Sequence, residues 1–147
     1  MARVLQLLPL GLLVLLGSCG RSDSPQTQIR RAIDAMETAA ESRDVGDVLA
    51  FVSTEFRDQY GEGRDELSRY LRAYFIANQS LHLLTRINSI ELPAADEARV
   101  KVTVGTVSRE ADATAAWNLA VDVHDFDVTM RKEGQKWNVT FVKWQRH

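Results

Sequence analysis

The chain of 147 residues has a single cysteine, Cys19, which limits how the fold can be stabilised. One thiol cannot form an intramolecular disulfide, so the folded part depends on its hydrophobic core. No cluster of metal ligands, glycine-rich phosphate loop or nucleophile elbow stands out along the chain. The sequence therefore predicts no metal site and no bound cofactor, and its motifs assign no catalytic residue.

The chain also lacks a strong charge of one sign and a long hydrophobic run. Lys and Arg number 18 against 20 Asp and Glu, a net charge of −2, and no Lys/Arg-rich run is present. This balance argues against nucleic acid as a partner. The apolar run over residues 4–16 is shorter than the roughly 20 residues that a membrane-spanning helix needs.

The N-terminal segment is typical of a secretory signal: Arg3 precedes the apolar run, and small residues follow it. Leu16-Gly17-Ser18-Cys19 resembles a bacterial lipobox, which implies cleavage before Cys19 and lipidation of its thiol. Gly20, in place of an aspartate, favours the outer membrane, with the domain facing the periplasm. Two alternatives are a plain signal peptide cleaved elsewhere and a buried N-terminal helix.

The expected organisation has three parts. Residues 1–18 form the lipoprotein signal peptide, 19–27 the lipidated cysteine with a polar tether, and 28–147 one folded domain. The length of the last part fits one domain with a core of its own. Anchoring through the N-terminal lipid makes the membrane the first predicted partner.

The hydrophobic pattern predicts helices first and strands afterwards. Helical spacing predicts helices from Pro25 to about Arg43, over 45–52 and from Asp65 to about Asn78, with 53–63 as a loop. Alternation then predicts strands over 81–92, 99–104, 117–130 and 137–144. The alternation slips by one residue before Ile90, at His124-Asp125 and after Phe141, and such slips are typical of β-bulges in a strongly curved sheet. The fold class is therefore α+β.

The chain resembles the nuclear transport factor 2-like (SnoaL-like, cystatin-like) superfamily. The segments that carry the resemblance are residues 39–47, Arg64-Asp65-Glu66-Leu67 and the closing segment 133–139. The resemblance implies a cone, with three N-terminal helices packed on a strongly curved antiparallel sheet. It also implies a cavity between the helices and the sheet.

Residues predicted to line this cavity are aromatic. They are Tyr70, Tyr74, Trp117, Phe126 and Trp137. Simple packing is the alternative role for each of them.

The ionisable candidates are His82 and the cluster of His124, Asp125 and Asp127. A carboxylate beside an imidazole can support general base catalysis. Strand alternation, however, predicts that all three members of the cluster face solvent, and His82 is predicted to be a surface or structural residue.

Three functions follow from this resemblance. The first is a non-catalytic domain that binds a small apolar ligand or an envelope protein. The second is an enzyme of isomerase or dehydratase type that uses the cone, and the third is a structural accessory subunit. A homodimer through the open face of the sheet, with Trp144 at its edge, is left open. An ionisable side chain pointing into the cone would favour the enzyme.

Overall fold

The computed structural model describes residues 22–110 and 119–147 and begins with three helices, as the sequence predicts, although the second helix ends at Leu49 and not at residue 52. The helices are α1 (Pro25–Glu41), α2 (Val45–Leu49) and α3 (Arg64–Ala77). Ser24 caps α1 by accepting a hydrogen bond from Thr27 N (3.2 Å), and Pro25 follows as the first helical residue. Such a cap satisfies a backbone N–H that has no partner within the helix.

Five strands form one curved sheet in the order β1-β5-β4-β3-β2. The strands are β1 (Val52–Asp58), β2 (Asn78–Ala94), β3 (Glu97–Glu110), β4 (Leu119–Glu133) and β5 (Lys136–Arg146). Strands β2 to β5 pair antiparallel in sequence order, and β1 pairs parallel with β5. The predicted α+β fold, with helices packed on a curved sheet, is confirmed.

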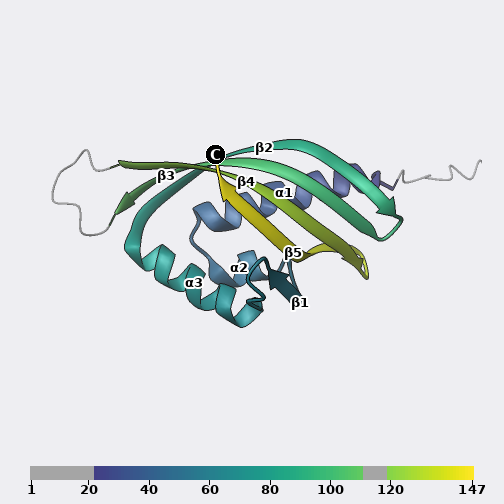
Figure 1. The fold of residues 1–147 in the computed structure, drawn as a ribbon, viewed down its shortest axis with the longest axis horizontal. Coiled ribbons are helices and arrows are strands. Elements are labelled where there is room, and N and C mark those ends of the chain that lie inside the picture. The colour runs from purple at the N-terminus through teal and green to yellow at the C-terminus, as the bar shows by residue number, and fades with distance from the viewer. Residues whose placement is uncertain (1–21, 111–118) are drawn as a thin grey trace, which may run out of the picture.

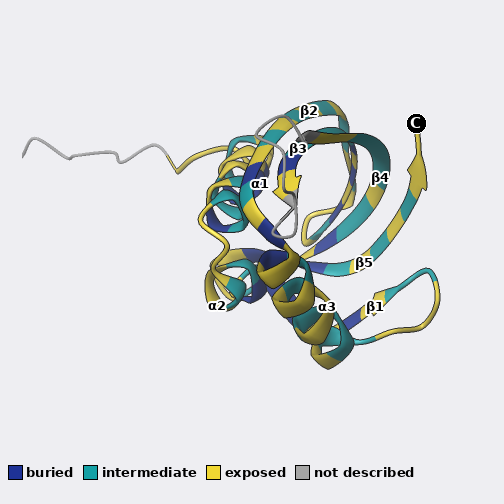
Figure 2. Cartoon of the chain, turned by 90° about the vertical axis from the view of Figure 1, so that its left-hand side faces the viewer, coloured by how far each residue is buried: buried dark blue, intermediate teal, exposed yellow. Residues whose placement is uncertain are grey.

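The sheet arches over the helices, so that its inner face is turned toward them (Figure 1). The buried residues gather where the sheet and helices meet (Figure 2). A fully buried aliphatic side chain stabilises a fold by about 1.5–3 kcal/mol, so this cluster holds the two layers together. Its largest members are Ile29, Ile33, Leu49, Phe56, Met130 and Trp137.

The prediction of a loop over residues 53–63 is wrong for its first half, which forms β1. This strand shows no regular alternation of buried and exposed residues, because Val52, Ser53 and Phe56 are all buried and its register against β5 is irregular. Its partners are Val139 and Phe141, far away in the sequence. A pairing this remote leaves no local alternation that sequence reasoning can detect.

Two of the three predicted bulges are present. The register of β2 against β3 shifts between Ile87 and Ser89. In β5 the extra residue is Thr140, because Met130 pairs with Val139 and Thr129 pairs with Phe141. Both bulges bend long strands and so increase the curvature of the sheet.

The third predicted bulge, at His124-Asp125, is absent. The pairing of β4 with β3 runs without a shift from Arg131, opposite Glu97, to Leu119, opposite Arg109. The inward or outward direction of the first half of β4 is therefore the reverse of the prediction, because a shift of one residue exchanges the two faces of a strand.

Within residues 22–110 and 119–147, no helix combines the length and apolar character that crossing a membrane requires. The predicted signal peptide, residues 1–18, and the lipidation site, Cys19, lie outside the described residues. Both stay predictions.

Candidate functional site

The uninterrupted register of β4 places two ionisable residues on the inner face of the sheet. Met130 is fully buried in the core, and alternate residues of a strand share a face. Counting back from Met130 in steps of two reaches Phe126, then His124 and Asp122. His124 and Asp122 therefore face the helices, contrary to the prediction that His124 faces solvent.

An arginine from the neighbouring strand holds the Asp122 carboxylate. Arg146 of β5 is paired with His124 of β4, and its Nε and Nη2 lie 2.9 and 2.8 Å from Asp122 Oδ1. The other oxygen, Oδ2, lies 3.9 Å from His124 Nδ1. The side chains of His124 and Asp122 are 28% and 38% exposed, so both remain accessible to a ligand.

Helix α3, which lies opposite the inner face of the sheet, contributes Tyr74. Burial raises the pKa of the Tyr74 phenol, a hydrogen bond with Ser108 opposes this effect, and the neighbouring Tyr70 and Asp122 add to it. Ser108 is only 4% exposed and lies on β3. The Tyr74 hydroxyl is protonated at neutral pH, as any tyrosine with an ordinary or raised pKa is, so it can donate a hydrogen bond. We call Tyr74, Ser108, Asp122, His124 and Arg146 the inner mouth.

Aromatic rings border the inner mouth. Tyr70 stacks on Tyr74 with ring centroids 6.0 Å apart, and His124 lies 6.2 Å from Phe126 at an interplanar angle of 47°. Phe126 packs in turn against the core cluster. The inner mouth thus combines polar groups of both hydrogen-bonding types with an apolar border, the composition of a small-ligand site.

The structure brings together only part of the predicted cavity lining. Tyr74 belongs to the inner mouth and Phe126 borders it, and Tyr70 stacks on Tyr74 although it is 63% exposed. Trp137 lies in the core, 3% exposed, with its Nε1 donating to Gln28 Oε1 at 3.3 Å. Trp117 lies outside the described residues.

The other ionisable candidates lie away from the inner mouth. Asp125 and Asp127 occupy the alternate positions of β4, on the outer face, as predicted. His82 is largely exposed, 3.9 Å from Glu41. Among the described residues, no group of three or more His, Cys, Asp or Glu side chains is placed to hold a metal ion.

Sequence reasoning missed Asp122, Ser108 and Arg146. Asp122 sits between Val121 and Val123. Because these two residues are apolar, the sequence suggests that they face inward and that Asp122, between them, faces outward. Yet Val121 is 69% exposed on the outer face. The signal that could have identified Asp122 was the alternation of Phe126, Val128 and Met130, continued backward without a slip.

The arrangement offers four polar side chains to a ligand. Arg146 and Tyr74 donate hydrogen bonds, Asp122 accepts them, and His124 can do either according to its protonation state. A proton can therefore be given or taken at His124 beside a fixed carboxylate.

No protein-family model matches the chain, and no curated protein matches it. Solved structures do resemble it. A scytalone dehydratase-like protein from Novosphingobium aromaticivorans has a TM-score of 0.75 at 14% identity, covering 83% of each chain. A ketosteroid isomerase-like protein from Erwinia carotovora atroseptica has a TM-score of 0.65 at 16% identity, over 82% of this chain and 94% of its own.

A third similar structure is a protein from Nostoc punctiforme with a cystatin-like fold. Its TM-score is 0.65 at 19% identity, over 83% of this chain and 90% of its own. Identities this low support a shared fold and not a shared activity. The chain therefore has the nuclear transport factor 2-like (SnoaL-like) fold, which confirms the resemblance found in its sequence.

Proposed function

We propose that the domain binds a small ligand at the inner mouth, and that the lipid on Cys19 holds it at the periplasmic side of the outer membrane. The observation that carries the binding proposal is the position of Asp122 and His124 on the inner face, opposite Tyr74. A ligand with an apolar body and one polar head fits this mixture, because the rings can cover the body while the polar groups orient the head.

The contacts divide the ligand into two parts. Phe126 and the stacked pair Tyr70–Tyr74 give the apolar body its surface. Arg146 and the protonated Tyr74 hydroxyl favour a head that accepts hydrogen bonds, such as a carbonyl or hydroxyl group. Asp122 disfavours a second negative charge beside it, so the head is neutral or carries a proton to donate.

The test compares two identical substitutions on one strand. Asp122→Asn changes the inner mouth, whereas Asp127→Asn changes the outer face, where Asp127 has its own cationic neighbour, Lys143, at 3.8 Å. The probes are small phenols and cyclic ketones, titrated into the full chain and followed through backbone amide shifts by NMR. We expect Asp122→Asn to change the affinity about tenfold, the worth of a hydrogen bond to a charged group, and Asp127→Asn less than about twofold.

Equal effects of the two substitutions, or shifts confined to the outer face, would contradict binding at the inner mouth. If no probe binds to the wild type or to either variant, and the protein binds an envelope protein instead, the accessory-subunit alternative is favoured.

A second candidate function is proton transfer, because His124 and Asp122 lie side by side on the inner face. Asp122 Oδ2 lies 3.9 Å from His124 Nδ1, and a carboxylate at this distance favours the imidazolium that forms when the ring takes a proton from a carbon next to a ligand carbonyl. Return of that proton to a different carbon gives an isomer. Its delivery to a departing hydroxyl gives water and an alkene, the reaction of a dehydratase.

Solvent exchange separates binding from catalysis. In heavy water, an active His124 exchanges the acidic carbon-bound proton of a cyclic ketone for deuterium, and NMR detects the loss of that signal. His124→Gln should abolish the exchange while leaving amide shifts on binding nearly intact. Exchange at the same rate in His124→Gln, or no exchange in wild type with a bound ketone, excludes this second function.

A further inference from the structure

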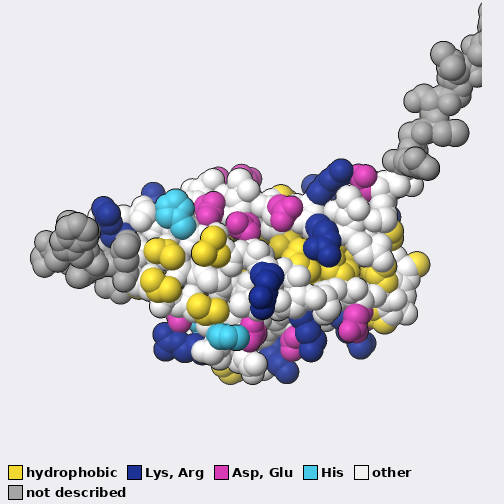
Figure 3. Space-filling model, turned by 90° about the horizontal axis from the view of Figure 1, so that it is seen from above, with side chains coloured by type: hydrophobic (Ala, Val, Ile, Leu, Met, Phe, Trp, Pro, Cys, Tyr) yellow, Lys and Arg dark blue, Asp and Glu magenta, His cyan; other side chains and the backbone are white. Residues whose placement is uncertain are grey.

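A hollow of about 340 Å³ lies on the outer face of the sheet, on the side opposite the inner mouth. Strands β2, β3, β4 and β5 all contribute polar side chains to it. A strongly twisted sheet is saddle-shaped, so a face that is convex in one direction is hollow in the other. Figure 3, which looks onto this face, shows basic and acidic side chains intermixed with histidine.

The cations in the hollow outnumber the carboxylates. Arg86, Lys101 and Lys143 face two acidic residues, Asp125 and Asp127. Concave sites lined by an excess of one charge concentrate ligands of the opposite sign. The hollow is therefore suited to an anion, provided that the two carboxylates already have partners within the protein.

Both carboxylates have partners within the protein. Asp125 accepts hydrogen bonds from Thr103 Oγ1 at 2.7 Å and lies 3.0 Å from His147 Nδ1. These two hydrogen bonds hold the pKa of Asp125 below its usual value, so the group stays ionised and accepts from both neighbours. Asp127 lies 3.8 Å from Lys143.

A chain of hydrogen bonds fixes the donors around Asp125. Thr103 accepts from Asn88 Nδ2 at 2.9 Å while donating to Asp125, and Asn88 Oδ1 accepts from Arg86 Nε at 3.0 Å. Each side chain in this chain therefore has its orientation set by the next one. The bond from Nε holds the guanidinium and leaves both of its Nη groups for a ligand, the pair that binds oxyanions in a fork.

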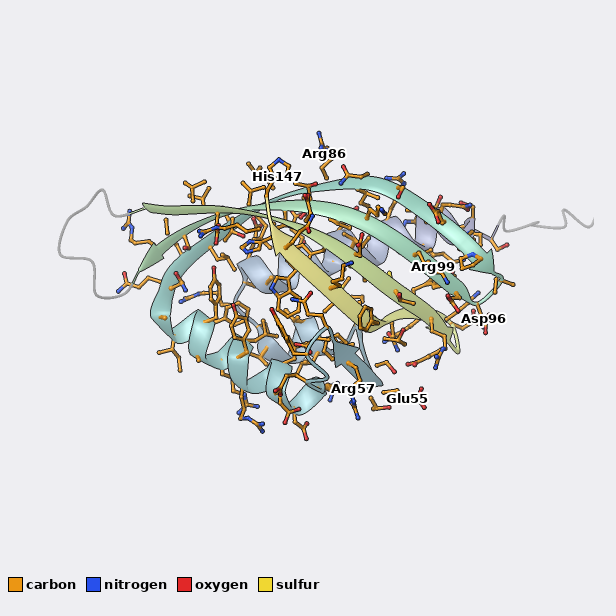
Figure 4. The ribbon with its side chains drawn as sticks, viewed as in Figure 1. Glu55, Arg57, Arg86, Asp96, Arg99 and His147 are labelled. Atoms are coloured by element: carbon orange, nitrogen blue, oxygen red, sulfur yellow. The ribbon has the colours of Figure 1, made fainter. Side chains whose placement is uncertain are left out.

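Arg86 and His147 rise from the same part of the outer face, whereas Arg99 lies farther along the sheet, toward the β2–β3 hairpin (Figure 4). His147 presents Nε2 away from Asp125, because its Nδ1 is engaged. The hollow thus collects the Nη groups of Arg86, the ammonium groups of Lys101 and Lys143, and one imidazole nitrogen.

We propose that this outer hollow binds an oxyanion, the carboxylate or phosphate group of a small molecule or of a lipid head group, through Arg86, Lys101 and Lys143. A hollow of this size is near the lower limit of about 300 Å³ for small-ligand sites, so it accepts a head group of metabolite size. This site is separate from the inner mouth, because His124 and Asp122 lie on the other face of the sheet.

The test uses inorganic phosphate titrated into the full chain at constant ionic strength, followed by amide NMR. Saturable shifts are expected at residues 86–88, 101–103, 143–145 and 147, with none at Asp122, His124 or Arg146 of the inner mouth. Sodium chloride at the same ionic strength should not reproduce them, because general screening acts on all exposed charges.

Matched substitutions separate a built site from general attraction. Arg86→Gln and Lys101→Gln should each weaken phosphate binding about tenfold, because each removes a charged hydrogen-bond donor. Arg99→Gln removes a cation from the same face outside the hollow and should change affinity less than about twofold. Melting temperatures of the three variants check that each is folded.

A second arm distinguishes the two sources of the anion. Vesicles of phosphatidylglycerol, with phosphatidylcholine vesicles as the neutral control, are tested for binding to the full chain in the presence and absence of phosphate. Binding to phosphatidylglycerol that requires Arg86 assigns the site to lipid head groups, and binding to phosphate alone assigns it to a soluble anion. The proposal is overturned if neither probe binds, or if Arg99→Gln weakens binding as much as Arg86→Gln.

Discussion

Ser53 of β1 donates a hydrogen bond of 2.7 Å to Glu133 Oε1, across a sequence separation of 80 residues. Asn138 Nδ2 donates to the other oxygen of the same carboxylate, also at 2.7 Å. Ser53 is 1% exposed, so its hydroxyl has no access to solvent. The hydrogen bond between Ser53 and Glu133 therefore links β1, the parallel edge strand, to the hairpin between β4 and β5.

The pH dependence of stability should reveal this bond. The hydrogen bonds from Ser53 and then Asn138 hold the pKa of Glu133 below its usual value of 4.5. A depressed carboxyl pKa stabilises the fold above the unfolded-state pKa, and the contribution is lost as the pH falls through the folded-state pKa. Ser53→Ala should therefore cost about 1–2 kcal/mol at pH 7, and its difference from wild type should shrink as the pH falls below about 4.5.

Urea denaturation between pH 3 and pH 7 measures this difference. Thr54→Ala is the matched control, because Thr54 is the exposed neighbour on the same strand, and it should stay within about 0.5 kcal/mol of wild type. A Ser53→Ala penalty that is constant with pH would show that Glu133 does not contribute through its charge.

Trp137→Ala should be among the most destabilising single changes in the chain. The side chain is 3% exposed and packs in the core cluster, and truncating a buried Trp costs about 3–5 kcal/mol. Phe141→Ala, on the same strand, is the control, because Phe141 is 38% exposed and should cost clearly less. Equal changes in the free energy of unfolding would contradict the assignment of Trp137 to the core.

Gly134→Ala should destabilise the hairpin between β4 and β5. Gly134 has φ 65°, in the left-handed region where a Cβ atom is strained by about 1–2 kcal/mol. Gly105→Ala provides the comparison, because its Cβ would lie an ordinary 3.7 Å from Leu84 Cβ. Thermal melting should show a lower midpoint for Gly134→Ala and little change for Gly105→Ala.

The anchor is tested by metabolic labelling with a fatty acid. Cys19→Ser removes the thiol that accepts the lipid, so the variant should incorporate no label and leave the membrane fraction or stay unprocessed. Ser18→Ala keeps a small residue before the cysteine and should label like wild type. Equal labelling of Cys19→Ser and wild type would refute the lipoprotein prediction.

The helices were predictable because their signals are local. Ser24 and Asp44 cap helices through bonds to residues three positions ahead, and Arg64–Ala77 carries its own apolar stripe. These features involve near neighbours, so each can be recognised without knowing what the helix packs against.

The edge strand β1 was not predictable because its stabilising contacts are remote. Ser53 meets Glu133, and Val52 lies beside Val139, both at the far end of the chain. The segment itself shows no regular alternation, so its sequence resembles that of a loop.

The sequence by itself determined the three helices, the four antiparallel strands that follow them and the two bulges near Ile90 and Phe141, because hydrophobic periodicity and caps are properties of neighbouring residues. The overall fold was indicated by the resemblance of its motifs to a known superfamily. Only the tertiary structure decided which residues of β4 face inward. Apolar residues occupy both parities of this strand, Val121 and Val123 on one and Phe126 and Val128 on the other, so the local pattern leaves the two faces equivalent. The continuous pairing with β3 removes the ambiguity, because it turns Val121 outward and turns Asp122 and His124 toward the helices.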